Sequence, residues 1–253
     1  MVEDGEVVRG GLTTVRRIGS TVIRPSGNHT PSVHRLLQHI ESNGFVHAPS
    51  PLALNAEAGT ETLTFMPGQV GHYPLPAVFR TNHTLVSAAR LLREYHDATA
   101  DFAASDTDVW LLPSRVPAEV ICHGDFAPYN CALADGVLSV FDFDTAHPWS
   151  RLADLGYAAY RWVPLTDPTN RDGFGTLDEQ RQRLGLFCET YGEQDRLAVL
   201  DAAIGRVGEL VDLMRRLAGN GHEAFAGHVA DGHDTRYLAD IEHMRANSVD
   251  LIR

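Results

Sequence analysis

The side chains of this sequence that could do chemistry are concentrated in two short stretches. The first, HGDFAPYN, places Asp125 five residues before Asn130, and the second, VLSVFDFDTAHP, adds Asp142 and Asp144. Gly124 lets the backbone bend sharply after a buried strand, so that Asp125 can project into a cleft and face a substrate. Mg²⁺ binds a few hard carboxylate and amide oxygens and keeps its other positions for water and phosphate. The set therefore predicts a metal ion bound to a nucleotide.

The order of these residues is that of phosphoryl transfer in kinases. There a catalytic Asp receives the hydroxyl proton, an Asn follows five residues on, and a metal-binding Asp lies on a later strand. The two stretches match the pattern H-G-D-x-x-x-x-N followed by hydrophobic-D-[FW]-[DEG]. On these motifs the chain resembles the aminoglycoside phosphotransferase and choline kinase-like family, and most of all its trifolitoxin immunity-like branch. The resemblance covers nearly the whole chain in layout and is specific around the two motifs.

The resemblance implies ATP and Mg²⁺ as cofactors and gives the motif residues their roles. Asp125 is the catalytic base, and Asn130 and Asp142 are the Mg²⁺ ligands. Asp154, in the stretch RLADLGYA, is the buried carboxylate that braces the catalytic loop. His123 is a structural residue of that loop rather than a proton carrier.

Five more positions take their meaning from the same resemblance. Gly10 and Gly11 match the turn that covers the phosphates, and Phe65 and Met66 match the hinge beside the adenine. Asp144 either supports the metal ligands or is simply an acid at the end of a strand.

The phosphate-binding lysine of kinase-like folds is missing, because all 21 residues counted as Lys or Arg are arginines. The third predicted strand ends at Arg24, which we expect to bind the phosphates instead, with a longer and bulkier planar fork. The helix position at which the family places the acidic partner of that lysine falls close to Val33, in a buried stripe. Glu41 shares one edge of this helix with His34 and is the nearest substitute for that partner.

The elements of the first 68 residues indicate a small β-rich part. Residues 6–24 alternate β-favouring runs with glycine-containing turns and predict three short antiparallel strands. TPSVHRLLQHIESNGF predicts a helix with Thr30 as N-cap and Pro31 at the first helical position. Two more strands are expected in PLALNA and TLTFM, around the turn-rich EAGTE. SGNHT also resembles a metallophosphoesterase element, but the motif order is wrong for that family and a capping turn explains it better.

Helical periodicity dominates the rest of the chain. Helices are expected at about 80–102, 150–163, 177–191, 194–218 and 235–250. The longest of them keeps the helical period from Leu197 to Leu217. We therefore predict an α+β, protein kinase-like two-lobed fold. Residues 1–68 would form the nucleotide-covering lobe, and residues 69–253 the larger, mainly helical lobe for catalysis and acceptor binding.

Composition argues against several classes of protein. The formal net charge of −12 disfavours a nucleic-acid partner, because phosphate backbones bind basic faces. No apolar run approaches the length of a membrane span, and the acidic start MVEDGEVVRG lacks the pattern of a signal peptide. A cytoplasmic protein without membrane contact is therefore expected. Cys122, Cys131 and Cys188 form no CxxC pair and are expected to be reduced and buried.

Together these features favour transfer of the ATP γ-phosphoryl group to a hydroxyl of a small molecule. Asp167, Asp172 and Asp178 surround a Pro- and Gly-containing segment of the acidic larger lobe, which suits a cationic acceptor such as an aminoglycoside-like antibiotic. The alternative is a nucleotide- or peptide-binding immunity protein of the same fold with little or no catalysis. Arg24 and the missing helix Glu favour this alternative, and the intact Asp and Asn motifs oppose it.

Overall fold

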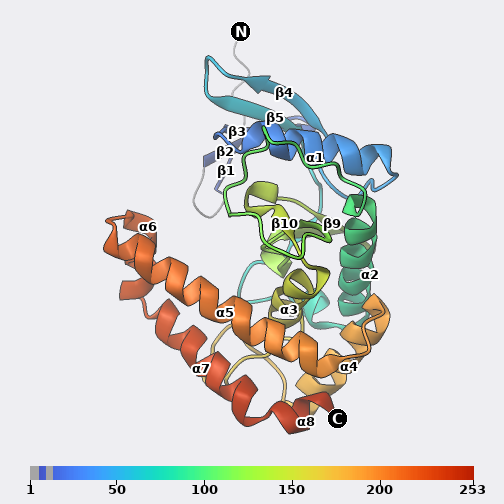
Figure 1. The fold of residues 1–253 in the computed structure, drawn as a ribbon, viewed down its shortest axis with the longest axis vertical. Coiled ribbons are helices and arrows are strands. Elements are labelled where there is room, and N and C mark those ends of the chain that lie inside the picture. The colour runs from blue at the N-terminus through green and yellow to red at the C-terminus, as the bar shows by residue number, and fades with distance from the viewer. Residues whose placement is uncertain (1–5, 10–13) are drawn as a thin grey trace. The chain divides into compact units, whose positions relative to one another are not determined.

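The computed structural model describes residues 6–9 and 14–253, which fall into two compact units (Figure 1). The first unit contains the described residues up to 70 and residues 94–125 and 130–150, and the second contains 71–93, 126–129 and 151–253. Gly10 and Gly11 lie outside the described residues, so the expected phosphate-covering turn stays a prediction. The expected lobe boundary between residues 68 and 69 also stays a prediction.

The largest sheet of the first unit is antiparallel and has five strands in the order β1-β2-β3-β5-β4. The strands are β1 (Glu6–Arg9), β2 (Thr14–Ile18), β3 (Thr21–Pro25), β4 (Pro51–Asn55) and β5 (Thr60–Thr64). The first three are those that the sequence predicts. Gly19, with φ 59°, makes the tight turn between β2 and β3. Strand β5 begins two residues earlier than TLTFM predicts, so the end of EAGTE belongs to a strand rather than to a turn.

One face of helix α1 (Thr30–Ser42) is buried in the way that its apolar spacing predicts. The buried stripe is Val33, Leu36, Leu37 and Ile40. The helix begins at Thr30 itself and His29 is its N-cap, so the expected N-cap is wrong by one residue. The reason is that the Thr30 hydroxyl accepts a hydrogen bond from Gly27 N at 2.9 Å and so closes the turn before the helix. SGNHT is therefore a helix-entry turn.

Two smaller sheets of the first unit position the motif loops. Strand β7 (Val120–Cys122) pairs with β10 (His147–Trp149). Strand β8 (Cys131–Ala134) pairs with both β6 (Gln69–Val70) and β9 (Val137–Val140). The HGD motif directly follows β7, and the FDFD segment directly follows β9. Both motifs are thus held at the end of a short paired strand.

The second unit is mainly helical. Helix α2 (Asn82–Thr99) contributes to both units and follows a short 3₁₀ turn at Ala77–Arg80. The later helices are α3 (Arg151–Trp162), α4 (Leu177–Tyr191), α5 (Arg196–Gly219), α6 (Glu223–Ala230), α7 (His233–Ala246) and α8 (Ser248–Ile252). The single helix predicted at 235–250 is wrong, because α7 ends at Ala246, with Asn247 as its C-cap. The Asn247 side chain donates to the carbonyl oxygen of His243 at 2.8 Å, and such bonds compete with helix continuation.

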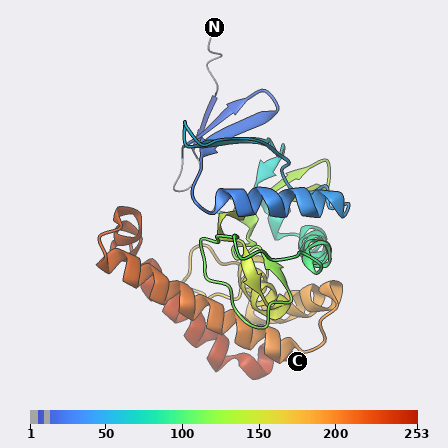
Figure 2. The ribbon, with the colours of Figure 1, turned by 45° about the horizontal axis from the view of Figure 1, so that its top comes forward.

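Helix α3 packs along the long helix α5, which also runs beside α7 (Figure 2). Gly156 makes the α3–α5 approach close, because a Cβ there would lie 2.6 Å from Ala203 N. All α3 residues from Ala153 to Trp162 are buried. Leu197, expected in the buried stripe of α5, is 45% exposed because it lies in the first turn. All three cysteines are buried, as predicted, and none of them forms a disulfide in the described part of the chain. No helix of the described residues is both long and apolar enough to cross a membrane.

Candidate active site

The loop after β7 is held from within by His123. Because the Asp125 backbone N–H can only donate, His123 Nδ1 accepts from it, at 3.3 Å. The other ring nitrogen, Nε2, lies 3.1 Å from the carbonyl oxygen of Phe141 and donates to it. Both contacts together require the neutral imidazole with its proton on Nε2. Gly124 has φ 80°, and a Cβ there would lie 2.5 Å from the carbonyl oxygen of Thr145, so only glycine fits this turn.

Asn130 is bonded to the side chain and the backbone of Asp125. Its Nδ2 donates to Asp125 O at 3.0 Å and to Asp125 Oδ2 at 2.9 Å. Two acceptors on one side fix the orientation of the amide. Its carbonyl oxygen Oδ1 therefore points away from Asp125 and is the oxygen that a cation could bind.

Asp142 and Asp144 leave the end of β9 in a strained backbone. Asp142 has φ 66° and ψ 68°, a left-handed conformation that few residues other than glycine adopt. A short 3₁₀ turn from Phe143 to Thr145 follows. The side chain of Asp142 is 47% exposed and that of Asp144 is 34% exposed. Both carboxylates are therefore accessible to a ligand.

Arg24, at the end of β3, binds three carboxylates with its three guanidinium nitrogens. Nε donates to Glu61 Oε1 at 2.8 Å, Nη1 to Asp142 Oδ1 at 3.0 Å, and Nη2 to Asp144 Oδ1 at 2.6 Å. The side chain is only 10% exposed. Arg24, which is expected to bind phosphate, thus contacts Asp142, the acid expected to bind metal.

The acidic partner of Arg24 is Glu61 and not Glu41, which corrects the expectation from the helix. Arg24 and Glu61 face each other directly in the β3–β5 pairing. Glu61 is 2% exposed and points to the same buried side of β5 as Leu63. Glu41 instead accepts a hydrogen bond from Ser50 Oγ at 2.7 Å, at the surface.

Two histidines extend this network, and sequence reasoning gave neither of them a role there. His34, on α1, places Nε2 2.7 Å from Glu61 Oε2, and His29 places Nε2 3.5 Å from Asp144 Oδ1. The sequence does contain a signal for Glu61. In the run TETLT, Glu61 and Leu63 alternate with threonines, which puts the acid on the inward face of a strand. Assigning Glu61 to a turn concealed that signal.

The two loop carboxylates titrate in opposite directions. Although the Asp142 side chain is partly exposed, desolvation by the neighbouring groups of the site and the like charge of Asp144 raise its pKa, and the charge of Arg24 offsets only part of this rise. Burial also pushes the pKa of Asp144 upward, but the hydrogen bond from His29 and the charge of Arg24 bring it below its ordinary value. Burial alone would lower the pKa of Arg24, yet its carboxylates, Asp144 first, raise it. Asp144 therefore keeps its charge more firmly than Asp142 does.

The remaining predicted site residues lie in separate places. Phe65 and Met66 directly follow β5, and the Phe65 N–H donates to Ser20 O at 2.8 Å. The Arg17 guanidinium lies 3.9 Å above the Phe65 ring. Asp154 is buried in the first turn of α3, in the second unit. The adenine-hinge and loop-bracing roles of these residues stay predictions.

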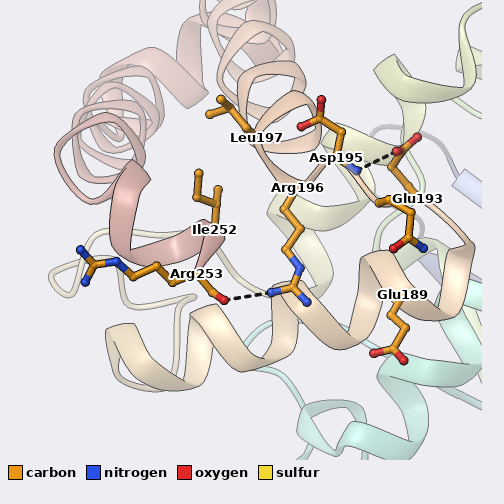
Figure 3. A pocket seen from close by; sticks show the side chains of 8 residues that line it. Glu189, Glu193, Asp195, Arg196, Leu197, Ile252 and Arg253 are labelled. Carbon is orange, nitrogen blue, oxygen red and sulfur yellow. Dashed lines mark hydrogen bonds between the residues drawn. The ribbon is translucent and has the colours of Figure 1, made fainter.

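A pocket of about 560 Å³ in the second unit contains none of the predicted site residues (Figure 3). It lies where α4 ends and α5 begins, beside the end of α8. The Arg196 guanidinium points toward the backbone oxygen of Arg253, at 3.4 Å, and Glu193 accepts from Asp195 N at 2.9 Å. Arg196 and Glu193 in this pocket are thus bonded to the chain itself.

Some known proteins are similar to this chain in sequence, and others are similar to it in fold. The phosphotransferase enzyme family matches residues 105–187. The trifolitoxin immunity protein of Rhizobium leguminosarum bv. trifolii is 32% identical over 191 residues, which is 72% of each chain.

Two solved structures have the same fold at low sequence identity. The structure of the amicoumacin kinase hAmiN in complex with AMP-PNP, Ca²⁺ and Ami matches with a TM-score of 0.67 and 12% identity, over 92% of this chain and 89% of its own. The choline kinase from Cryptosporidium parvum Iowa II matches with a TM-score of 0.63 and 12% identity, over 97% of this chain and 90% of its own. These matches confirm the predicted protein kinase-like fold. By its sequence relatives and its fold, the chain belongs to the phosphotransferase enzyme family.

Proposed function

We propose that the chain is an ATP- and Mg²⁺-dependent transferase that phosphorylates a hydroxyl of a small molecule. The observation that carries the proposal is the contact between Asn130 and Asp125. It holds the Asp125 carboxylate in place and turns the amide oxygen of Asn130 outward. Together with the accessible carboxylate of Asp142, this supplies the hard oxygen donors that Mg²⁺ prefers. When bound, Mg²⁺ would neutralise negative charge on the phosphates of ATP.

In this proposal Asp125 acts as the general base. Its carboxylate receives the proton of the acceptor hydroxyl while the oxygen attacks the γ-phosphorus, and the leaving oxygen belongs to ADP. His123 braces the loop without exchanging protons, because both of its ring nitrogens are engaged with the backbone. The buried Asp154 supports the same loop, and residues 69–253 form the acceptor-binding lobe.

Arg24 would take the place of the absent lysine. Its Nε stays bound to Glu61, which anchors the side chain on the sheet. Its Nη1 and Nη2, which contact Asp142 and Asp144, are the groups that would turn to phosphate oxygens. In the same lobe, residues 1–68, Gly10 and Gly11 would cover the phosphates, and the hinge at Phe65 and Met66 would lie beside the adenine.

One of the similar structures supports a proposal for the kind of acceptor. The hAmiN structure contains AMP-PNP, Ca²⁺ and Ami, so a kinase with this fold binds a nucleotide, a divalent cation and a small molecule together. We propose an acceptor of comparable size, with an antibiotic as the leading candidate and resistance as the biological consequence.

A second candidate function is nucleotide binding in an immunity protein that transfers phosphate weakly or not at all. The relative at 32% identity is named an immunity protein. In addition, Arg24 already forms ion pairs with Asp142 and Asp144, so that a metal ion would compete with a cation of the chain itself.

Two measurements test and separate these functions. The first is thermal stabilisation by ATP with and without Mg²⁺, and the second is ADP release stimulated by a panel of hydroxyl-bearing antibiotics. If the chain is a transferase, ATP binding depends on Mg²⁺, and at least one acceptor stimulates ADP release in the parent but not in Asp125→Asn. Binding without stimulated release favours the immunity reading. If ATP with Mg²⁺ does not stabilise the chain, both readings are wrong.

A further inference from the structure

A buried arginine in the second unit has no carboxylate partner. Arg161, on α3, is 9% exposed. Among the described residues, no Asp or Glu oxygen comes within ion-pair distance of its guanidinium. Burying a charge without a counter-ion is costly, because the low-dielectric interior replaces the water that solvated it. The surroundings of Arg161 must therefore supply a compensating group or receive one from a ligand.

Tyrosines surround this guanidinium instead of acids. Its central carbon lies 5.0 to 5.6 Å from the ring centroids of four of them, which with Arg161 form what we call the tyrosine cluster. These are Tyr129, Tyr157, Tyr160 and Tyr237. Tyr157 and Tyr160 are buried, whereas Tyr129 and Tyr237 are only half-buried. Tyr157 and Tyr160 thus shield the cluster from solvent, and solvent reaches it at Tyr129 and Tyr237.

Arg161 donates hydrogen bonds to the hydroxyl groups of two tyrosines in the cluster. Arg161 Nε donates to the Tyr157 hydroxyl at 3.1 Å, and Nη2 donates to the Tyr237 hydroxyl at 3.1 Å. A hydroxyl oxygen that accepts from a cation is a better donor through its own proton. Tyr157 can pass that proton to the Tyr129 hydroxyl, which is 3.1 Å away. The accessible end of this network, at Tyr237, then presents an O–H donor.

The acid whose charge acts on both Tyr160 and Arg161 already accepts three hydrogen bonds. Asp240 is completely buried and receives hydrogen bonds from the Tyr160 hydroxyl at 2.6 Å, from Asn170 Nδ2 at 2.8 Å and from Asp167 N at 2.7 Å. Its charge acts on Arg161 only from a distance. A fifth tyrosine, Tyr73, also feels the charge of Arg161. Burial raises the pKa of Tyr73 to about 12, the charge of Arg161 lowers it, and the charge of Asp172 raises it to a smaller extent than burial does.

We propose that the tyrosine cluster binds an anionic group, a carboxylate or a phosphate, carried by the acceptor. This proposal rests on the proposed function for the existence of an acceptor. The chemistry is that of anion recognition, in which a guanidinium and aligned hydroxyl donors face one negative group. Tyr129 directly precedes Asn130 in the catalytic motif, so the cluster belongs to the same segment as the catalytic residues. A cationic acceptor would be repelled by Arg161, which reverses the charge expected from the acidic composition.

Four hexoses that differ in one substituent test the charge of the ligand: glucuronate, glucose 6-phosphate, glucose and glucosamine. Each is titrated into the full chain while the NMR signals of the Arg161 Nε–H and of the tyrosine rings are followed. Inorganic phosphate is the minimal probe. We expect saturable shifts with the anionic probes at about millimolar affinity and none with glucose or glucosamine. A response to glucuronate alone identifies a carboxylate, and a response to the two phosphates alone identifies a phosphate. If glucosamine binds as well as the anions, or if no anion shifts the Arg161 signal, the inference is wrong.

Substitutions assign the binding to the cluster. Tyr237→Phe removes one aligned hydroxyl and should weaken anion binding roughly tenfold. Tyr191→Phe is the matched control, because its ring lies beside Arg93 and not beside Arg161, and it should leave anion binding unchanged. Arg161→Gln should abolish binding, and Tyr237→Phe keeps the test decisive if Arg161→Gln does not fold. Equal anion affinity in Tyr237→Phe and the parent overturns the assignment.

The titration needs neither ATP nor Mg²⁺, so its result is independent of phosphoryl transfer. Anion binding without Mg²⁺-dependent ATP binding would support the cluster and refute the proposed function. Active transfer to an acceptor without a negative group would refute the cluster and support the function.

Discussion

Replacement of Glu61 by Gln tests whether this buried acid holds Arg24 in place. The Glu61 carboxylate accepts from Arg24 Nε at 2.8 Å, lies 2.7 Å from His34 Nε2, and is 2% exposed. Removal of one partner from a buried ion pair costs about 3–5 kcal/mol when the other charge is left alone. Arg24 keeps two other carboxylates, so the loss is closer to that of a hydrogen bond to a charged group. We expect the free energy of unfolding to fall by about 2 kcal/mol.

Denaturant titration and Mg²⁺-ATP titration measure the two consequences of Glu61→Gln. A loss of about 2 kcal/mol corresponds to a lower melting temperature by roughly 4–8 °C for a chain of this size. Nucleotide affinity should fall by about tenfold, because Arg24 loses the anchor that positions its Nη1 and Nη2 for phosphate. Combined with Arg24→Gln, the loss should be smaller than the sum of the single losses, as expected for residues in contact.

Glu41→Gln is the matched control, because it makes the same chemical change at the acid that the helix pattern favoured. Its carboxylate bonds to Ser50 at the surface, so its substitution should change stability by no more than about 0.5 kcal/mol. If Glu61→Gln is as mild as Glu41→Gln in both titrations, Glu61 does not position Arg24 and the reasoning from the strand register is refuted.

Five further substitutions, at four positions, test the site. Asp125→Asn should lower transfer by roughly 10² to 10⁴ and spare Mg²⁺-ATP binding, as measured by ADP release and thermal shift. Asp142→Asn should weaken Mg²⁺-dependent stabilisation by ATP itself; equal stabilisation in parent and variant would exclude it as a ligand. Arg24→Ala should reduce ATP affinity, and Arg24→Lys should restore it only in part, since a lysine lacks the two-pronged contact. The pKa of Asp144 is lowered in the folded protein, so its charge stabilises the fold above pH 3.8, its ordinary pKa. The difference in free energy of unfolding between the parent and Asp144→Asn should therefore disappear as the pH falls through that lowered pKa.

Local motifs made much of the site predictable. Asp125 and Asn130 are five residues apart, so their contact depends on one loop and one glycine rather than on the whole fold. The Arg24–Glu61 contact depends on how β5 inserts beside β3, across 37 positions of sequence. No local pattern reports that pairing, and Glu61 looked like part of a turn.

The same distinction holds for the helices. The stripe of α1 follows directly from apolar spacing, whereas the break at Asn247 depends on one side-chain hydrogen bond. The tyrosine cluster gathers residues from three separate segments around Arg161. Spacing in the sequence gives no sign of this convergence, because each tyrosine by itself fits an ordinary helix or loop.

The position of Glu61 on a strand changes how such a site can be regulated. Where the acid partner lies on a mobile helix, rotation of that helix separates the pair and gives the enzyme an off state. Here Arg24 and Glu61 belong to neighbouring strands of one sheet, so their contact persists for as long as the sheet does. A shift of α1 could break only the contact of His34. Under the proposed function, control would then act through nucleotide or acceptor occupancy rather than through rotation of a helix.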